Sequence, residues 1–475
     1  MLEELEKEQE QQDEGLDYDT IVEKQTDRLA ELLDRRDMKE LQRRMEELNE
    51  FDVAEFLSEI DDNRMPMVFR LLSKETAADV FANFDPPEQE RIINAITDSE
   101  LAGIIDELYV DDAVDIVGEL PANVVKRVMR AATPQTRNLI NQYLRYPENS
   151  AGSIMTAEFV DLKKYMSVKE SIARIRRIGE DRETIYVCFV ISADRKLEGI
   201  VTVKDLLLAD DDTIIEDLMD RNVIFASTTE DQESVSEKFA DYDLMALPVV
   251  DNEGRLVGIV TVDDVMDVME QEATEDIEKL AGMLPSDKPY SRTSIIEIWK
   301  NRIPWLMFLM LSATFTSMIL TSFEDMLAVQ AGLVAFIPML MGTGGNSGAQ
   351  ASTAVIRALS LGDIEPKDAL SVMWRELRVA FLCGLALAMV NFVKMLVLDG
   401  MILHNDAVTV QVAATVSSSI LFIVLFAKSV GALLPILAEK IGVDPAVMAN
   451  PLISTVTDAV SLLIYIYVAK LILHI

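Results

Sequence analysis

The last apolar stretch of the chain, PLISTVTDAVSLLIYIYVAKLILHI (residues 451–475), is long enough to cross a membrane as a helix and contains a carboxylate, Asp458. A charge inside such a segment is costly, so this residue indicates a functional site. Asn450 and Ser454 precede it at intervals of four residues, and a helix places all three on one face. The stripe predicts a cation path. The alternative is a set of polar side chains that hold two membrane helices together.

Four more apolar segments precede this one, which gives five expected membrane helices, each near or above the roughly 20 residues that a spanning helix needs. They cover about residues 303–322, 329–358, 373–398, 409–437 and 448–473. The first and third connections between them contain no Lys or Arg, whereas Lys or Arg residues lie at the other flanks. By the positive-inside rule, this pattern places the N-terminus in the cytoplasm and the C-terminus outside.

Acidic residues are concentrated in the part of the chain before these segments. Residues 291–475 contain 12 acidic and 11 basic residues, whereas residues 1–290 contain 69 acidic and 32 basic residues. A soluble part with this excess of acidic residues repels nucleic acid and anionic lipid surfaces. A nucleic-acid-binding protein is therefore excluded. Multivalent cations are the expected partners, and the alternative is that the acidity only keeps the protein soluble.

Nothing in the sequence indicates an enzyme. His404 and His474 are too few and too isolated for a zinc or catalytic cluster, and the chain has no P-loop, no ion-pump phosphorylation motif and no nucleophile beside a base. Cys188 and Cys383 lie in different halves, as expected in a reducing compartment. The polar, acidic residues 1–20 contain no apolar run typical of a cleavable signal.

Residues 48–132 repeat with a period of 24. The copies are LNEFDVAEFLSEI (48–60), LSKETAADVFANF (72–84), ITDSELAGIIDEL (96–108) and LPANVVKRVMRAA (120–132). Each copy opens with an apolar residue and a Ser, Thr, Asn or Pro helix-start signal, followed by helical apolar spacing. Two short helices per unit predict a helical superhelix whose units bury their apolar faces on each other.

A second, longer repeat follows. GIVTVKD (199–205) recurs as GIVTVDD (258–264), and each copy also contains a helical stretch and short β-branched strands such as LPVV (247–250). The repeat resembles a tandem pair of CBS domains, a regulatory module that often dimerises. The resemblance implies an adenine-nucleotide site at the repeated Gly-x-x-Thr-x-x-Asp pattern, through Thr202, Asp205 and Thr261.

Acidic helical repeats, a CBS pair, a connector and five apolar segments, in this order, resemble the MgtE family of magnesium channels over almost the whole chain. SAGSIMT (150–156) is similar to the family's junction into the CBS pair, and PMLMGTGGNSGAQ (338–350) to its second membrane helix. Asn450-Pro451 followed by Thr457-Asp458 resembles the fifth. The glycines of residues 338–350 serve either close helix packing or direct ion contact.

The resemblance implies a homodimer with the pore on its two-fold axis, where one Asp458 from each subunit faces the other and Asn450 and Ser454 line the path. Mg²⁺ keeps most of its water and is usually held by one or two carboxylates, which suits such a pair. The acidic run 264–276 is typical of a solvated helix face, but the resemblance implies Mg²⁺ binding there. The implied regulatory carboxylates are Asp111, Asp115, Asp231, Glu233, Asp243, Asp264, Asp267, Glu272, Glu275, Asp276 and Asp444.

We therefore expect a multidomain protein. Its parts are a flexible acidic N-terminus (1–20), an all-α superhelical domain (21–150), an α/β tandem CBS pair (151–267), a connecting plug helix and linker (268–293) and an all-α transmembrane domain of five helices (294–475). The resemblance implies a multi-pass homodimer in the lipid of the bacterial cytoplasmic membrane, with Mg²⁺ and, at the CBS pair, ATP as ligands.

The expected function is Mg²⁺-selective uptake through a channel, down the electrochemical gradient. Cytosolic Mg²⁺ bound by the regulatory carboxylates would hold the plug helix, about residues 268–282, at the pore and close it. Two alternatives stay open: a secondary transporter coupled to Na⁺ or H⁺, and a membrane-anchored CBS sensor through which no ion passes. The presence of Asp458 as the single intramembrane acid favours the channel over the coupled transporter.

Overall fold

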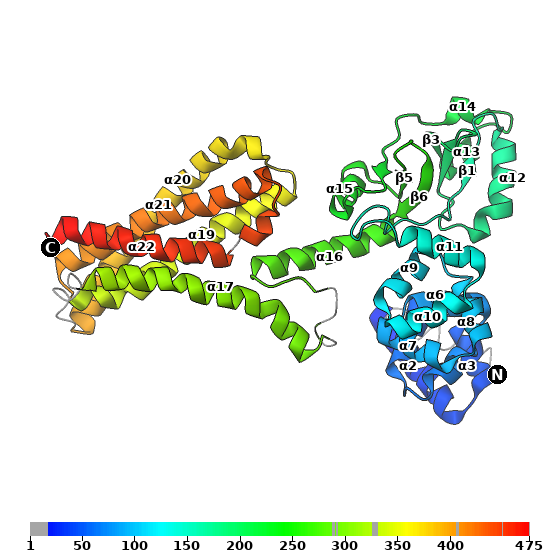
Figure 1. The fold of residues 1–475 in the computed structure, drawn as a ribbon, viewed down its shortest axis with the longest axis horizontal. Helices are drawn as coiled ribbons and strands as arrows, with labels where there is room; N and C mark the ends of the chain where they lie inside the picture. The colour runs from blue at the N-terminus through cyan, green and yellow to red at the C-terminus, as the bar shows by residue number, and fades with distance from the viewer. Residues whose placement is uncertain are drawn as a thin grey trace. The chain divides into compact units, whose positions relative to one another are not determined.

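The computed structural model describes residues 18–286, 290, 293–324, 331–404, 408–448 and 450–474 (Figure 1). Contacts divide the chain into two compact units, Met1–Met269 and Glu270–Ile475. The first unit holds an all-helical region and two small sheets, and the second is helical. Of the expected flexible N-terminus, residues 1–17 lie outside the described part.

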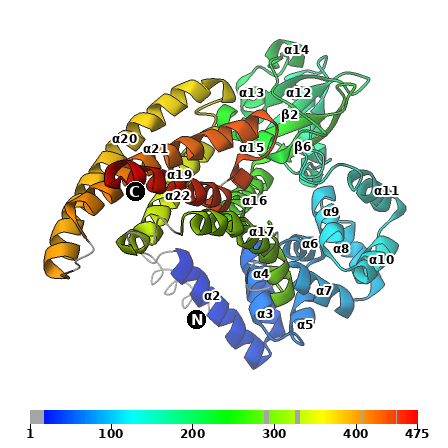
Figure 2. The ribbon, with the colours of Figure 1, turned by 60° about the vertical axis from the view of Figure 1, so that its left-hand side comes forward.

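Short helices, coloured from blue to cyan in Figure 2, open the first unit. α2 (Tyr18–Arg35) and α3 (Met38–Met45) precede four helix pairs. The pairs are α4 (Glu50–Glu59) with α5 (Met65–Phe69), α6 (Lys74–Ala82) with α7 (Pro86–Ala95), α8 (Asp98–Ile105) with α9 (Val110–Glu119), and α10 (Ala122–Ala131) with α11 (Pro134–Tyr143). Because the first helices of the four pairs start 24 residues apart, the predicted repeat is confirmed.

In each pair, the residue before the first helix explains where that helix begins. The side chains of Asn49, Ser73 and Thr97 each accept a hydrogen bond from a backbone N–H of the first turn, and Thr97 completes a capping box with Glu100. Pro121 takes this position in the fourth repeat. The caps set the helix starts, while burial of the apolar faces supplies most of the stability.

Ion pairs connect neighbouring repeats. Arg91 lies 2.9 Å from Asp62, and Arg127 lies 2.9 Å from Asp98. In each pair the arginine belongs to the repeat that follows its carboxylate, although the two pairs join different positions within the repeat. These pairs are partly exposed and each contributes little stability, about 0–1 kcal/mol. Their effect is to neutralise part of the acidic surface, which is then not free to bind cations.

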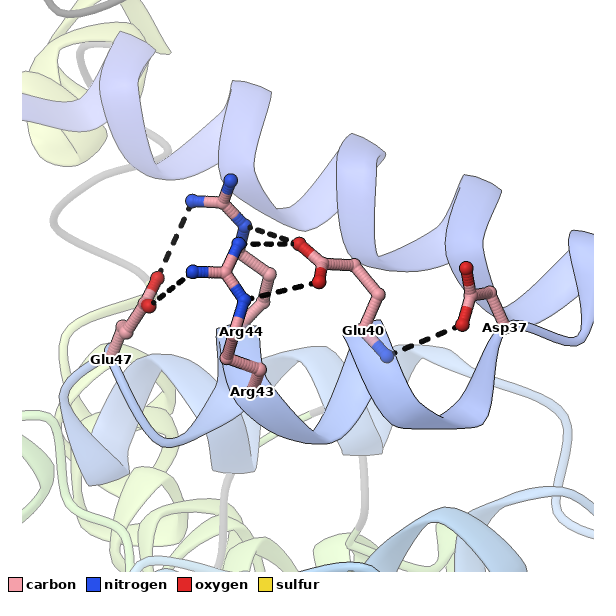
Figure 3. A network of polar contacts seen from close by, with 5 residues as sticks. All are labelled: Asp37, Glu40, Arg43, Arg44 and Glu47. Atoms are coloured by element: carbon pink, nitrogen blue, oxygen red, sulfur yellow. Dashed lines mark hydrogen bonds and ion pairs between the residues drawn. The ribbon is translucent and has the colours of Figure 1, made fainter. Parts of the chain in front are cut away.

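A denser network of the same kind occurs at α3 (Figure 3). Glu40 accepts hydrogen bonds from Arg43 at 2.6 Å and from Arg44 at 3.2 Å, and both arginines also contact Glu47. Asp37 caps the helix by accepting from the Glu40 N–H. The hydrogen bond from Arg43, aided by Arg44, lowers the pKa of Glu40 to about 2. Glu40 is therefore ionised and already paired with arginines of its own helix.

The CBS pair forms two three-stranded sheets. The first copy contains β1 (Asp161–Leu162), α12 (Val168–Ile178), a 3-10 turn (Gly179–Asp181), β2 (Val187–Ile191), β3 (Leu197–Thr202) and α13 (Val203–Leu208). The second contains α14 (Ile215–Leu218), β4 (Ala226–Ser227), α15 (Gln232–Tyr242), β5 (Ala246–Val250) and β6 (Leu256–Thr261). In each sheet the middle strand pairs parallel with the first strand and antiparallel with the third. The predicted α/β tandem repeat is confirmed.

Each copy is completed by a segment from outside it. Thr156, ahead of the first copy, exchanges backbone hydrogen bonds with Ile259 of β6, and Asp220 exchanges them with Ile200 of β3. A Cβ added at Gly258 would lie 2.7 Å from the Thr156 carbonyl oxygen, and the equivalent glycine of the first copy is similarly crowded. These close approaches explain why the Gly-Ile pairs and their partner segments repeat together in the sequence.

α16 (Val262–Leu280) starts in the first unit and ends in the second. The remaining helices are α17 (Ile295–Ser322), α19 (Ile337–Ser360), α20 (Ala369–Lys394), a π-helical continuation (Met395–Ile402), α21 (Val410–Lys440) and α22 (Asn450–Leu473). Short 3-10 helices cover Ala331–Phe336, Pro366–Asp368 and Pro445–Met448. α19, α20 and α22 pack against α21, and α17 packs against α22.

Four helical stretches among the described residues are long and apolar enough to cross a membrane: Ile295–Ser322, Pro366–Ile402, Val410–Lys440 and Pro451–Leu473. α19 lies within the second expected span but is not among these four, and its sequence is rich in glycine and hydroxyl residues. The expected count of five membrane helices therefore stays a proposal, although five long helices follow α16 in the part of the chain that the structure describes.

Candidate functional site

Carboxylates from three elements of the first unit gather in one place. α9 carries Asp111, Asp112 and Asp115, the first turn of α16 carries Asp263 and Asp264, and Glu183 follows the 3-10 turn of the first CBS copy. We name these six residues the acidic cluster. Besides burial, the charge of Asp264 raises the pKa of Asp112, and the charge of Asp263 raises that of Glu183, so these residues lie close together.

Apolar residues on the same helices hold the acidic cluster in place. In α9, Val110, Ala113 and Val117 are buried in the core of the first unit. In α16, Val265 and Val268 are buried after the acidic first turn. With these apolar faces fixed, the adjacent aspartates have no freedom to move away from each other without unpacking the helices.

Asp111 is the most deeply buried member of the cluster, with only 8% of its surface exposed. Its Oδ1 atom has no hydrogen-bond partner among the described residues. Burial, followed by the charges of Asp112 and Asp264, raises the pKa of Asp111 well above its ordinary value. A buried carboxylate with one oxygen left unpartnered is unfavourable in its charged form, so a bound cation would stabilise it.

The pKa values of four other members are raised as well. Burial raises the pKa of Asp112 to about 6 and that of Asp264 to about 6, although Asp264 also accepts a hydrogen bond from the Thr261 hydroxyl at 2.6 Å. Burial and the charge of Asp263 raise the pKa of Glu183 to about 8. Asp115 has a solvent-accessible side chain, yet the protein around it and Glu119 raise its pKa to about 7.

The cluster is a concentration of negative charge and not a finished coordination shell. Among the described residues, no three His, Cys, Asp or Glu side chains converge closely enough to hold a metal ion directly. The unpartnered Asp111 oxygen and the mutual repulsion nevertheless fit a hydrated dication, because Mg²⁺ is commonly held through its waters by one or two carboxylates. Asp111, Asp115 and Asp264 are the predicted regulatory residues that the fold brings together here.

The carboxylates predicted near α15 lie at its two ends. Asp231 is the N-cap and accepts from the Glu233 N–H at 2.9 Å, whereas Asp243 is the left-handed C-cap. The 11-residue helix separates them, so Asp243 does not share a site with the other two within this copy of the chain. On α16, Asp267 is exposed and Glu272 is half-buried.

Glu275, Asp276 and Asp444 are brought together in the second unit, with a lysine among them. Lys279 Nζ lies 2.5 Å from Glu275 Oε1 and 2.6 Å from Asp444 Oδ2. Burial, and then the charge of Asp444, raises the pKa of Asp276. The family resemblance implied that these three carboxylates take part in regulation, but nothing in the sequence indicated Lys279 between them.

On α22, Asp458 is half-buried and makes no hydrogen bond or ion pair with any described residue. Ser454 lies one turn earlier, and its Oγ would be 3.5 Å from a Cβ added at Gly345 of α19. The side chain of Asn450 lies outside the described residues, so its predicted place in the stripe is untested. The helical spacing that relates Ser454 to Asp458 is present in α22.

Gly344 and Gly348 of α19 serve close helix packing. A Cβ at Gly344 would lie 2.6 Å from Ser461 Oγ of α22, and one at Gly348 would lie 2.7 Å from Ile453 Cγ2. A Cβ added at Gly431 of α21 would lie even closer to the Gly348 carbonyl oxygen. Of the two roles that the sequence left open, packing therefore accounts for Gly344 and Gly348.

The threonines of the expected nucleotide site have a structural role of their own. Thr202 and Asp205 form a capping box at the start of α13: the hydroxyl accepts from the Asp205 N–H, and the carboxylate accepts from the Thr202 N–H at 3.0 Å. Thr261 donates to Asp264 in the equivalent place. The repeated Thr-x-x-Asp pattern is thus explained by helix capping whether or not a nucleotide binds.

Sequence reasoning missed three members of the acidic cluster: Asp112, Asp263 and Glu183. The doublets Asp111-Asp112 and Asp263-Asp264 were a usable signal, since each second aspartate lies beside a chosen one. Glu183 had no local signal, because it joins the cluster only through the fold of the first CBS copy.

Comparison with known families gives three matches. The model described as divalent cation transporter matches residues 337–468, the MgtE intracellular N domain matches 48–149, and the CBS domain matches 151–212 and 215–271. The magnesium transporter MgtE of Thermus thermophilus is 39% identical over 94% of this chain and 98% of its own length. That of Bacillus subtilis is 28% identical over 90% of this chain and 93% of its own length.

Two solved structures resemble the first part of the chain. The crystal structure of the soluble part of a magnesium transporter aligns with a TM-score of 0.51 at 30% identity, covering 53% of this chain and 99% of that one. The cytosolic domain of the Mg²⁺ channel MgtE in complex with ATP aligns with a TM-score of 0.48 at 37% identity, covering 50% of this chain and 98% of that one.

Proposed function

The chain belongs to the MgtE family of magnesium transporters, and on that basis we propose that it is a channel through which Mg²⁺ enters the cell down its electrochemical gradient. The observation that carries the proposal is Asp458, a half-buried carboxylate in an apolar helix that no described residue neutralises. Such a residue is stable there only if water or a cation reaches it.

The path requires a second copy of the chain. A single α22 offers one carboxylate, whereas a two-fold homodimer with the axis beside α22 offers two, facing each other at the same depth. Two carboxylates neutralise a dication without replacing its water, which is the binding that Mg²⁺ favours. Ser454 and Asn450, one and two turns nearer the cytoplasm, would line the same path.

We assign regulation to the carboxylates outside the membrane. In the first unit, Asp111, Asp115 and Asp264 would hold Mg²⁺ between α9 and the start of α16, and neutralisation of their charge would favour the packed arrangement. Only a difference in affinity between the packed and the loosened arrangement can shift their populations. If the packed arrangement holds α16 at the pore, high cytosolic Mg²⁺ closes the channel.

The remaining expectations belong to this proposal. The protein would be a homodimer of five-span subunits in the cytoplasmic membrane, with its N-terminus in the cytoplasm and its C-terminus outside, and with the five parts bounded at residues 20, 150, 267 and 293. Asp231, Glu233, Asp243, Asp267 and Glu272 would join regulatory sites completed in the dimer. ATP would bind at the CBS pair near Thr202, Asp205 and Thr261, which calorimetric titration of the purified protein with ATP would test.

A flux assay separates the channel from its alternatives. Vesicles containing the purified protein and a Mg²⁺ indicator should take up Mg²⁺ at a rate set by the Mg²⁺ gradient and the membrane potential alone. Collapsing the Na⁺ and H⁺ gradients should leave the rate unchanged. A rate that falls with either gradient would favour a coupled transporter, and an absence of uptake under all conditions would favour a sensor.

A further inference from the structure

The C-terminal end of α16 is seated directly on the first turn of α22. Gly282, with φ of +70°, ends the helix by donating its N–H to the Lys279 carbonyl, and Met283 donates to Glu278. A Cβ added at Gly282 would lie 2.7 Å from Pro451 Cγ. The helix end that carries Lys279 therefore packs against the helix that carries Asp458, without room for a larger residue at the contact.

Lys279 takes the place between two carboxylates where a metal ion was expected. Its ammonium lies 2.6 Å from Asp444 Oδ2 and 2.5 Å from Glu275 Oε1, and the other Asp444 oxygen accepts from the Ala446 N–H at 2.7 Å. Both oxygens of Asp444 are thus engaged. Burial by itself would lower the pKa of Lys279, but its hydrogen bonds to Asp444 and Glu275 raise it, so the ammonium stays charged.

The surrounding charges make this lysine necessary in the seated arrangement. Glu275, Asp276 and Asp444 bring three carboxylates to one place, and the charges that oppose them are Lys279 and, at longer range, Arg357. Without Lys279 the carboxylates on α16 and the one at Asp444 would repel each other, and α16 would separate from the segment before α22 unless another cation replaced the ammonium.

We propose that Lys279 is a positioning residue of the gate: its ammonium is a built-in cation that holds the end of α16 against the base of α22 without Mg²⁺. This rests on the proposed function, because it assumes that seating of α16 closes the path. At Glu275 and Asp444 the lysine and a Mg²⁺ ion are alternatives, so the Mg²⁺ dependence of closure arises mainly at the other regulatory carboxylates.

The distance between α16 and the end of α21 tests the proposal independently of conduction. Ala281 and Ile441 are exposed and suit spin labels after Ala281→Cys and Ile441→Cys, in a chain with Cys188 and Cys383 replaced and with labelled subunits diluted in unlabelled ones. In EDTA, Lys279→Met should reduce the ratio of short to long distances about two- to fivefold, the range for one partly exposed ion pair. Saturating Mg²⁺ should reduce the difference in this ratio between Lys279→Met and the parent, because a Mg²⁺ ion can then occupy the place of the missing ammonium.

Two further variants make the result specific. Lys440→Met removes an equal charge from an exposed lysine at the end of α21 and should leave the ratio unchanged. Adding Asp444→Asn to Lys279→Met should lower the ratio no further, because the two residues act as one pair. An unchanged ratio for Lys279→Met, or an equal fall for Lys440→Met, would overturn the proposal. If the parent protein does not close when Mg²⁺ is raised, that result would instead contradict the proposed function. The distances measured in EDTA could still be interpreted in that case.

Discussion

Asp111 of α9 and Asp264 of α16 lie close enough that the charge of Asp264 raises the pKa of Asp111, although one belongs to the helical repeats and the other to the end of the CBS pair. The fold therefore stores electrostatic repulsion at the junction of two domains. A dication relieves that repulsion, and this is the physical basis for regulation by Mg²⁺ in this chain.

Asp111→Asn should stabilise the metal-free protein and weaken its response to Mg²⁺. The amide keeps the shape of the side chain but removes a buried charge whose Oδ1 has no partner among the described residues. We expect the unfolding midpoint in EDTA to rise by roughly 3–6 °C, as for about 1 kcal/mol or slightly more, and the gain on adding Mg²⁺ to shrink. Thermal unfolding of the detergent-solubilised protein checks both. A lower midpoint in EDTA would mean that the Asp111 charge is stabilised by the protein itself.

Stability should also depend on pH in a predictable direction. Burial raises the folded-state pKa of Asp112 and Asp264 to about 6 and that of Glu183 to about 8, above the values of about 4 expected when unfolded. The folded state thus binds more protons than the unfolded state, so stability is greatest below about pH 4 as far as these groups are concerned and is lost as pH rises towards 8. In EDTA the temperature of the unfolding midpoint should decrease as the pH is raised from 5 to 8. A rise across that range would contradict the clustered, buried carboxylates.

Replacing Asp458 with Ala should abolish Mg²⁺ flux while the protein stays folded and dimeric, because the change removes an unneutralised charge from an apolar helix. Asp458→Glu should impair flux as well, since an extra methylene displaces the carboxylate relative to a hydrated ion. Uptake into vesicles, alongside size-exclusion chromatography for the oligomer, measures both effects. Parent-like uptake by the alanine variant would remove Asp458 from the path.

Neutralising five of the acidic residues of α16 together should give the opposite phenotype. The five substitutions are Asp264→Asn, Asp267→Asn, Glu272→Gln, Glu275→Gln and Asp276→Asn. Removing sites that favour the seated arrangement shifts the population towards the open one, so conduction should persist at internal Mg²⁺ concentrations that close the parent. Conduction below that of the parent at low Mg²⁺ would show that these carboxylates support the open state instead.

Helix packing in the second unit gives a matched pair of substitutions. Gly431→Ala places a methyl group against the Gly348 backbone carbonyl, whereas Gly342→Ala finds nothing within 4 Å. The first should destabilise the packing of α19 on α21 by about 1–3 kcal/mol, and the second should have little effect. Yield and unfolding midpoint in detergent distinguish them. Equal behaviour of the two variants would mean that α19 and α21 do not pack in this way.

The repeats were predictable because their signals are local. Helix starts recur every 24 residues with caps at Asn49, Ser73 and Thr97, and the CBS copies carry matching Gly-Ile strands. What could not be predicted depends on contacts between distant segments. Neither the unpartnered Asp111 oxygen nor the approach of Lys279 to Asp444 has a periodic signature in the sequence.

The acidic surface illustrates the same limit. Composition indicated cation binding but could not distinguish carboxylates that arginines already neutralise, such as Glu40, from those that only repel each other, such as Asp112. The direction of the pKa shift separates the two groups. This direction depends on the burial and the neighbouring charges of each carboxylate, which are set by the fold.

Single-channel recording from the purified protein in a planar bilayer, with Mg²⁺ as the permeant ion, tests the central claim most directly. We predict unitary Mg²⁺ currents that close as Mg²⁺ is raised on the cytoplasmic side and that are absent from the Asp458→Ala variant. Mg²⁺ uptake by the same preparation without unitary currents, or unitary currents unaffected by the loss of Asp458, would contradict the account.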